Sequence, residues 1–285
     1  MRILVAYDGS VSAEAAFEDL RRAGLPLEAE ALVVCVADSI DLVHSQTTAA
    51  SAVERIQSYF PQWRVSSDVL CGSPAKELAD ATGSGHPDLV VIGSHGRSGI
   101  RRLFLGSVSW ELIHRAECSI RVARLGGSSN LHDPIRIVIG IDGSEVASMA
   151  VRSVAARCWP ENTEAVIISA VQTLVPVTTS LEESTFAQEP AYSVIREADE
   201  RLRARLGNIT EESADALRRA GLIATTRLVD GDPREAILAA AEITRADTIF
   251  VGARGLGRMD RLLLGSVSSY IVTHAHCSVE VVRAQ

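Results

Sequence analysis

The feature that most constrains this chain is an internal repeat. The stretch DLVVIGSHGRSGIRRLFLGSVSWELIHRAECSIRVAR is echoed later by DTIFVGARGLGRMDRLLLGSVSSYIVTHAHCSVEVVR. Matching positions keep a constant separation along these stretches, as Gly93 does with Gly252 and Cys118 with Cys277. The openings VAYDGS and IGIDGS also match, at a shorter separation. A repeat of this length is too long for a solenoid unit, so the sequence predicts two domains of one architecture.

The predicted domains are residues 1–126 and 133–285, with a linker at about 125–134. The linker sequence LGGSSNLHDP gathers Gly, Ser, Asn and Pro where hydrophobic periodicity lapses. Matching positions lie farther apart in the later stretches than at the openings, so the second copy must contain additional chain between them. Most of it is assigned to the weakly hydrophobic, helix-prone stretch 182–207.

Each copy shows short β-branched strands that alternate with amphipathic helices. In the first copy the predicted strands are 2–7, 31–37, 64–70, 88–92 and 119–124, and the predicted helices are 12–23, 48–60, 74–82 and 105–116. In the second copy the predicted strands are 135–141, 165–171, 223–229, 248–251 and 278–283. This alternation predicts an α/β fold with a doubly wound, Rossmann-like, five-stranded parallel sheet in each domain.

Two pairs of residues are predicted to begin helices. Ser10 and Ser144 follow Asp-Gly and can cap the first helix of each copy, because a serine hydroxyl accepts an otherwise unbonded amide hydrogen. Pro74 and Pro233 suit the first turn of a later helix, where the missing N–H costs nothing.

Composition argues against several classes of function. The net charge is −8 and basic residues form no block, which argues against nucleic acid as a partner. No apolar run approaches the roughly 20 residues of a membrane span, and the first apolar run is too short for a signal peptide. The expected location is therefore the cytoplasm. The five cysteines form no CxxC pair, so reduced thiols are expected.

A glycine-rich loop follows the fourth strand of each copy. The spacing is Gly93-x2-Gly96-x9-Gly106-Ser107 in the first copy and Gly252-x2-Gly255-x9-Gly265-Ser266 in the second. Glycines there can bring the backbone close to a ligand and adopt positive φ, and a Gly-Ser helix start points amide hydrogens at an anion. Ser109 and Ser268 add hydroxyl groups. The alternative is that these glycines only form ordinary turns, but the recurrence of the same spacing in both copies favours a phosphate site.

Charged residues border these loops. Asp8 and Asp142 end the first strand of each copy and suit the ribose or base of a nucleotide, because a carboxylate repels phosphate; the alternative is an Asp-Gly turn closing onto Ser10 or Ser144. A few of the loop arginines could neutralise phosphate, although most of them fit better as solvated cations of the loop or of a helix face. These arginines are Arg97, Arg101 and Arg102 in the first copy and Arg254, Arg258 and Arg261 in the second.

The whole chain resembles the universal stress protein family, as two family domains in series. The resemblance rests on GSHGRSG with LGSVS, and on GARGLG with LLGSVS followed by HAHCSVEVV. Both copies match G-x2-G-x9-G-[ST], the signature of the ATP-binding branch. The resemblance implies ATP, or AMP or ADP, at the carboxyl edge of the sheet, sometimes with Mg²⁺. The residues it implies for the nucleotide are Asp8, Val36, Gly93, Gly96, Arg97, Gly106, Ser107, Val108 and Ser109 in the first copy, and Asp142, Val171, Gly252, Gly255, Gly265, Ser266, Val267 and Ser268 in the second.

The chain departs from the family pattern near its last strands. The family usually has Pro after the Cys that precedes the last strand, where this chain has Ser119 and Ser278. Arg121 and Arg124 stand in a strand that is usually apolar, and the resemblance implies that this strand mediates dimerisation. The predicted assembly is an intramolecular pseudo-dimer, with a homodimer of chains also open.

Three functions are consistent with these observations. The leading hypothesis is a nucleotide-binding regulatory protein in which ATP occupancy sets conformation or partner choice. A slow ATP hydrolase or phosphotransferase is the alternative, although the sequence has no GxxxxGK[ST] loop and no kinase motif. His95 could supply a base, but the second copy has Arg254 there. A scaffold without nucleotide is the third possibility. No catalytic residue and no metal ligand is predicted.

Overall fold

The computed structural model of the protein describes residues 1–37, 42–95, 105–124, 133–172, 190–255 and 264–284. The N-terminal half contains β1 Arg2–Ala6, α1 Val11–Leu20, β2 Glu30–Ala37, α2 Leu42–Tyr59, β3 Arg64–Cys71, α3 Pro74–Gly85, β4 Leu89–Gly93, α4 Ser107–Arg115 and β5 Ser119–Ala123. The C-terminal half contains β6 Arg136–Gly140, α5 Glu145–Ala155, β7 Glu164–Val171, α7 Pro190–Arg219, β8 Ile223–Asp230, α8 Pro233–Thr244, β9 Thr248–Gly252, α9 Ser266–His274 and β10 Ser278–Val282. Most of the predicted linker lies outside the described residues.

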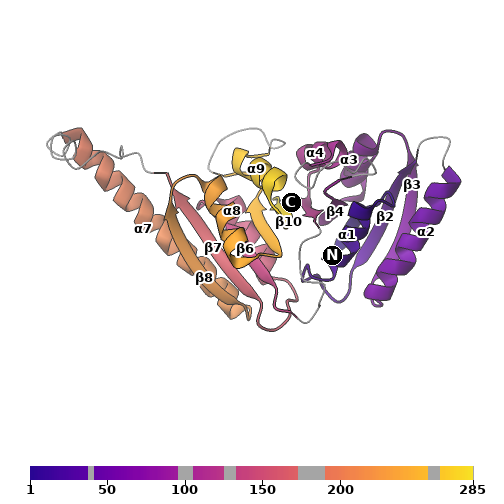
Figure 1. Ribbon diagram of the computed structural model, residues 1–285, viewed down its shortest axis with the longest axis horizontal. Helices are drawn as coiled ribbons and strands as arrows, with labels where there is room; N and C mark the ends of the chain where they lie inside the picture. The colour runs from indigo at the N-terminus through magenta and orange to yellow at the C-terminus, as the bar shows by residue number, and fades with distance from the viewer. Residues whose placement is uncertain (38–41, 96–104, 125–132, 173–189, 256–263, 285) are drawn as a thin grey trace.

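The ten strands form one sheet in the order β3-β2-β1-β4-β5-β10-β9-β6-β7-β8 (Figure 1). Within each half all neighbouring strands are parallel, which confirms the predicted doubly wound five-stranded fold. The two halves meet where β5 pairs with β10 in the antiparallel direction. The sequence predicted two sheets, and the structure joins them edge to edge into a single one.

Helices cover both faces of the sheet because its strands are apolar on both sides. Ile3 and Val5 of β1 pack in one core with α1 and α2, whereas Leu4 and Ala6 face α3 and α4. The core beneath α3 and α4 continues across β5 and β10 to α8 and α9. The apolar core therefore runs through the junction between the halves on that face.

The predicted helix starts are present. The Ser10 hydroxyl accepts from the Ala13 amide, and the Ser144 hydroxyl accepts from the Ala147 amide, each at 3.2 Å. Both capping predictions are confirmed. Pro233 likewise stands in the first turn of α8, as Pro74 does in α3.

The residues that depart from the family pattern lie at the junction. The Arg124 amide donates to the Ser278 hydroxyl at 3.0 Å, and the Arg283 amide donates to the Ser119 hydroxyl at 3.2 Å. Each arginine also reaches a helix of the other half: Arg124 Nη2 donates to the carbonyl of Val272, and Arg283 Nη2 to that of Ile113, both at 2.5 Å. These arginines are compatible with the pairing of β5 and β10, because their guanidinium groups donate hydrogen bonds to backbone carbonyl groups on the other side of the junction.

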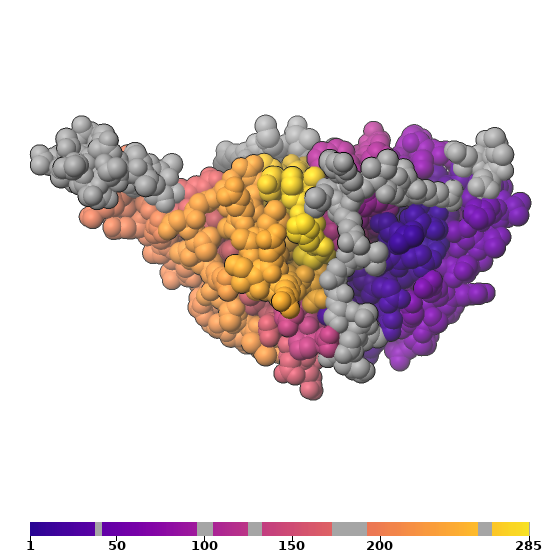
Figure 2. Space-filling view, viewed as in Figure 1, coloured from indigo at the N-terminus to yellow at the C-terminus, as the bar shows by residue number. Residues whose placement is uncertain are grey.

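Helix α7 contains part of the additional chain of the second copy. It has 30 residues, whereas α2, its counterpart, has 18. Its N-terminal end extends away from the rest of the C-terminal half (Figure 1), and the two halves lie side by side in the space-filling view (Figure 2). Within the described residues, no helix is both long and apolar enough to cross a membrane.

Candidate functional site

A cavity of about 430 Å³ lies in the N-terminal half at the carboxyl ends of β1, β2 and β4. The strand order reverses between β1 and β4, and ligands of open α/β sheets bind at such a point. Seven of the predicted site residues line this cavity: Asp8, Val36, Gly93, Gly106, Ser107, Val108 and Ser109. The predicted residues Gly96 and Arg97 lie outside the described residues.

One wall of the cavity is apolar. Val34 and Val36, two positions apart on β2, both line it, together with Leu78 of α3 and Ile92 of β4. Residues two apart on a strand point to the same face, so this spacing could have predicted Val34 from Val36. The sequence analysis missed Val34, Leu78 and Ile92 as site residues, because their apolar side chains read as ordinary core.

Asp8 supplies a carboxylate at the end of β1. Its Oδ1 accepts from the Ser10 amide at 2.9 Å, so the Asp-Gly turn considered as an alternative is present. The turn and the cavity are compatible, since Asp8 also lines the cavity. Asp142 makes the same contact with the Ser144 amide at 2.9 Å. The turn therefore fixes the orientation of both carboxylates.

The start of α4 forms another part of the cavity wall. Gly106 is the N-cap residue, and no described side chain caps the helix. Its φ is −63°, and the matching Gly265 has a φ of −68°, so the expectation of positive φ is wrong at these glycines. The Gly106 amide donates to the Ser94 carbonyl at 2.8 Å. The first-turn amides of α4 consequently lie beside the cavity in a region of positive potential from the helix dipole.

The glycines that end β4 and β9 are required by packing. A Cβ atom at Gly93 would lie 2.6 Å from the carbonyl oxygen of Ser12, in the first turn of α1. A Cβ atom at Gly252 would lie 3.0 Å from the backbone of Val146, in the first turn of α5. Close approach between strand and helix explains both residues without a ligand.

Ser109 and Ser268 hold their helices to the sheet. The Ser109 hydroxyl donates to the Gly93 carbonyl at 2.9 Å, and the Ser268 hydroxyl donates to the Ala253 carbonyl at 3.0 Å. Both side chains are buried. Each hydroxyl hydrogen is therefore committed to the backbone, whereas Ser107 and Ser266 at the same helix starts are exposed.

His95 also lines the cavity, although the sequence analysis did not include it among the site residues. Its Nδ1 lies 2.9 Å from the Ser94 hydroxyl, and its amide donates to the Ser12 hydroxyl at 3.0 Å. Its Nε2 is buried and has no hydrogen-bond partner among the described residues. The imidazole is thus held by one nitrogen, and its other nitrogen has hydrogen-bonding capacity left.

In the corresponding region of the C-terminal half, two glycines lie in close contact with neighbouring side chains. A Cβ atom at Gly255 would lie 2.1 Å from Oδ2 of Asp142, so the loop backbone lies against that carboxylate. A Cβ atom at Gly140, the counterpart of Ala6, would lie 2.5 Å from the Cδ1 atom of Ile237. Ile237, the counterpart of Leu78, thus occupies the place that a methyl group would take at Gly140, and the loop backbone lies against Asp142.

Val171 is not the counterpart of Val36. Glu30 pairs with Arg2 and Glu164 with Arg136, so β2 and β7 correspond from their first residues and Ala170 matches Val36. Val171 is fully buried, like Ala37, while Val36 is partly exposed. The predicted equivalence was wrong by one residue, which moves the side chain to the other face of the strand.

The comparisons with known proteins match both halves. The sequence model of the Universal stress protein family matches residues 1–124 and again residues 135–283. This chain belongs to the universal stress protein family. The predicted resemblance and the tandem arrangement are thereby confirmed.

The relatives are distant in sequence. A universal stress protein of Mycobacterium tuberculosis is 28% identical over 221 residues, which is 77% of this chain and 69% of that protein. One from Thermus aquaticus is 32% identical over 148 residues, covering 52% of this chain and 97% of its own length. The crystal structure of a universal stress protein from Archaeoglobus fulgidus aligns over 99% of this chain and 98% of its own, with a TM-score of 0.67 and 21% identity. At that identity the structure supports the fold alone.

A larger cavity of about 670 Å³ lies between the two halves. Its walls carry both carboxylates and guanidinium groups, including Asp88 and Glu117 of the N-terminal half and Arg254 and Arg283 of the C-terminal half. This mixture of charges selects no ligand class. The described residues contain no group of three or more His, Cys, Asp or Glu side chains placed to hold a metal ion.

Proposed function

We propose that this universal stress protein binds an adenine nucleotide, ATP foremost, and that nucleotide occupancy regulates its conformation or its choice of partner. The observation that carries the proposal is the cavity of about 430 Å³ at the carboxyl edge of the N-terminal sheet. Its volume lies within the range of small-molecule sites, about 300–1,000 Å³. Family membership supports the proposal without specifying the nucleotide.

The distribution of charge in the cavity suits the parts of a nucleotide. The apolar wall formed by Val34 and Val36 can pack against a flat base, since burying apolar surface is favourable. The Asp8 carboxylate can accept hydrogen bonds from ribose hydroxyls. The first turn of α4 can donate amide hydrogens to phosphate, and the helix dipole favours a negative charge there. Mg²⁺ would arrive with the triphosphate, and no described side chain is assigned to it.

The proposal places the principal site in the N-terminal half. In the C-terminal half, the backbone at Gly255 lies against the Asp142 carboxylate, where a ribose would have to bind. Binding there would require the loop to move first. A site that must open before it can bind has a lower apparent affinity for its ligand.

Helix α4 gives the site a connection to the rest of the molecule. Its first turn borders the cavity, and the carbonyl of Ile113 near its other end accepts from Arg283 of the C-terminal half at 2.5 Å. A ligand that shifts α4 would therefore strain a contact with the other half. This connection supports a regulatory role for nucleotide binding.

Matched variants in the two halves test the proposal. Asp8→Ala and Asp142→Ala remove the same turn contact, 2.9 Å in each half, so they should perturb folding to a similar extent. We expect the unaltered protein to bind ATP at a single site in calorimetric titration. Asp8→Ala should weaken binding at least about tenfold, a loss of roughly 1.4 kcal/mol, while Asp142→Ala should change it little. No binding by the unaltered protein, or equal losses in both variants, would contradict the proposal.

His95 supports hydrolysis as the alternative function. Its Nε2 has no hydrogen-bond partner among the described residues and can accept a proton beside the cavity when Nδ1 donates to the Ser94 hydroxyl. Phosphate release by the unaltered protein and by His95→Ala decides this question. A slow rate that disappears in His95→Ala, with ATP affinity retained, would favour the enzyme.

A further inference from the structure

Opposite charges face each other at the centre of the junction between the halves. Arg121 of β5 and Glu280 of β10 are direct partners in the antiparallel register. Both side chains are fully buried. Arg121 Nη1 lies 3.3 Å from Glu280 Oε2. Buried charges need partners, so the residues around this pair decide whether it is stable.

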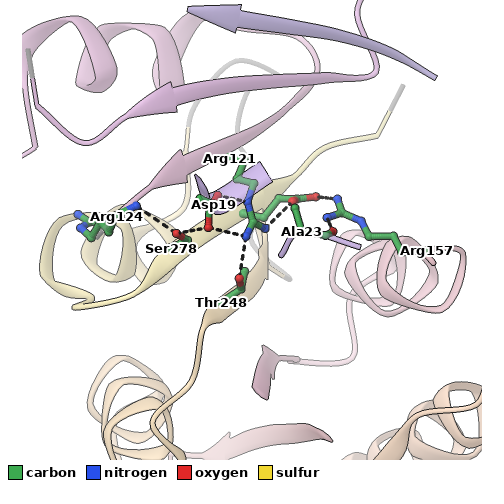
Figure 3. A network of polar contacts seen from close by, with 8 residues as sticks. Asp19, Ala23, Arg121, Arg124, Arg157, Thr248 and Ser278 are labelled. Atoms are coloured by element: carbon green, nitrogen blue, oxygen red, sulfur yellow. Dashed lines mark hydrogen bonds and ion pairs between the residues drawn. The ribbon is translucent and has the colours of Figure 1, made fainter. Parts of the chain in front are cut away.

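The pair belongs to a chain of four charges that alternate in sign (Figure 3). At one end, the Asp19 carboxylate accepts from Arg121 Nε at 2.5 Å and from Arg121 Nη2 at 2.9 Å. At the other end, Arg157 donates to Glu280 Oε1. The order across the junction is therefore Asp19, Arg121, Glu280, Arg157, and the net charge of the four side chains is zero.

Neutral groups satisfy the remaining donors and acceptors. Thr248 Oγ1 accepts from Arg121 Nη2 at 2.8 Å, and Ser278 Oγ donates to Asp19 Oδ1 at 2.6 Å. Arg157 Nη1 donates to the Ala23 carbonyl at 2.7 Å. Although burial opposes the charged form, the carboxylates of Asp19 and Glu280 hold the pKa of Arg121 above its usual value. For Arg157, burial outweighs the Glu280 carboxylate and lowers the pKa below its usual value, so Arg121 is the more strongly held cation of the network.

The two copies of the repeat contribute different residues to this network. Arg121 and Glu280 occupy the same position of the repeat, three residues after the matching Cys118 and Cys277. When the openings of the two copies are aligned, Asp19 matches Ser153 and Arg157 matches Ala23. Each half consequently carries one ion pair of its own, Asp19 with Arg121 in the N-terminal half and Arg157 with Glu280 in the C-terminal half. The charge nearest the junction is positive in the N-terminal half and negative in the C-terminal half.

We propose that this charge order is a recognition code, which directs β5 to pair with β10 of the other half and not with β5 of a second chain. Two N-terminal halves paired through β5 would place Arg121 against Arg121. Two C-terminal halves paired through β10 would bury Glu280 against Glu280. Like charges opposed in a low-dielectric junction are repelled, whereas the mixed pairing alternates throughout.

Reversal of the order in one half tests the code without changing the composition. The half-reversed variant Glu280→Arg/Arg157→Glu keeps the net charge and one ion pair per half, but places two arginines at the centre. We expect the amides of β5 and β10, and those of Arg124 and Arg283 directly after these strands, to exchange hydrogen at least about tenfold faster in the full-length protein. The complementary variant Asp19→Arg/Arg121→Glu places two glutamates at the centre. Native mass spectrometry of the two half-reversed variants mixed together, one of them isotope-labelled, should show heterodimers, because only pairing between the two chains restores the alternation of charge.

Two further variants separate charge order from side-chain size. The fully reversed variant adds Asp19→Arg and Arg121→Glu, which restores alternation, and it should recover much of the lost protection. The control Arg196→Glu/Glu200→Arg reverses an exposed pair on α7 and should behave like the unaltered protein.

Three outcomes would overturn the proposal: unchanged exchange in the half-reversed variant, equal damage in the half-reversed and fully reversed variants, or no heterodimers in the mixture of the two complementary half-reversed variants. If the half-reversed chain does not fold, Arg121→Met/Glu280→Met takes its place. This apolar pair carries no charge preference and should fold with increased mixing of chains. Unchanged mixing in that variant would equally reject the code.

Discussion

At the scale of single residues, Ser119 and Ser278 make hydrogen bonds that the proline usual at these positions in the family could not make. Ser278 accepts from the Arg124 amide at 3.0 Å and donates to Asp19 at 2.6 Å, while Ser119 accepts from the Arg283 amide at 3.2 Å. Proline at these positions would supply neither contact. The hydroxyls therefore join the last strand of one half to the other half.

Ser278→Ala should lower the free energy of unfolding by about 1–3 kcal/mol, because it leaves the buried Arg124 amide without its partner and removes one of the two hydrogen bonds to Asp19 Oδ1. The pseudo-equivalent Ser119→Ala removes one contact with an amide and should cost about 1 kcal/mol. Denaturant unfolding monitored by circular dichroism measures both. A larger loss in Ser119→Ala would contradict this account of the junction.

The cysteines separate into reactive and protected thiols. Cys71 and Cys158 are exposed, whereas burial raises the pKa of Cys118 to about 11 and that of Cys277 to about 12. Because the thiolate is the reactive form, a maleimide at pH 8 should label Cys71 and Cys158 and leave Cys118 and Cys277 unlabelled. Peptide mass spectrometry identifies the labelled sites.

The same raised pKa values have a consequence for stability. The folded protein holds these two thiol protons more tightly than the unfolded chain does. Their contribution to stability is complete below the ordinary cysteine pKa of about 8.5 and is lost as the pH rises through about 11 and 12. Cys277→Ala should reduce the decline in stability at alkaline pH, measured by denaturant titration between pH 8 and pH 11.

At the scale of elements, α7 has two distinct parts. Its first buried side chain among the described residues is Leu206, followed by Thr210, Ala214 and Leu217, which pack at the spacing of one helical face. Arg196 and Arg201, nearer the N-terminal end, are 67% and 76% exposed and form ion pairs with acidic residues one turn away. The first part therefore depends on local interactions, which stabilise a helix weakly.

Limited digestion with trypsin should consequently cleave after Arg196 or Arg201 before it cleaves the second part of α7. Arg218, which donates to Glu211, Asp215 and the Ala224 carbonyl, should resist longer. Timed digestion followed by intact-mass analysis gives the order. Early cleavage after Arg218 would mean that the packed part opens as easily as the extended one.

At the scale of the whole molecule, the junction makes one unit out of two repeats. The sheet continues from β5 to β10, and the apolar core beneath α3, α4, α8 and α9 continues with it. A four-charge network lies buried at the same place. Opening this junction would expose apolar surface and charged groups together, which couples the stability of the halves.

We therefore expect a single cooperative transition in differential scanning calorimetry, with the calorimetric enthalpy equal to the van't Hoff enthalpy. Arg121→Met leaves Asp19 and Glu280 without their shared partner. It should cost about 3–5 kcal/mol, the penalty of breaking a buried ion pair, and lower the midpoint. Two separate transitions in the unaltered protein would show that the halves unfold independently.

The sequence by itself determined the features that depend on neighbouring residues and on repetition. The period of the apolar residues predicted the strands and helices, Ser10 and Ser144 predicted the caps, and the repeated glycine loops directed attention to the edge where the cavity lies. Each of these follows from chemistry within a few residues. The positive φ expected of the loop glycines was wrong at Gly106 and Gly265, because close approach does not require an unusual backbone angle.

Only the tertiary structure decided which distant residues meet. Val34 and Leu78 join Asp8 at one cavity, and Ile237 packs against Gly140 in the other half, through contacts between separate elements. Arg121 reads in sequence as a disturbance of an apolar strand. Its partners Asp19 and Glu280 are far from it along the chain, so only the pairing of β5 with β10 turns that arginine into the centre of a neutral network.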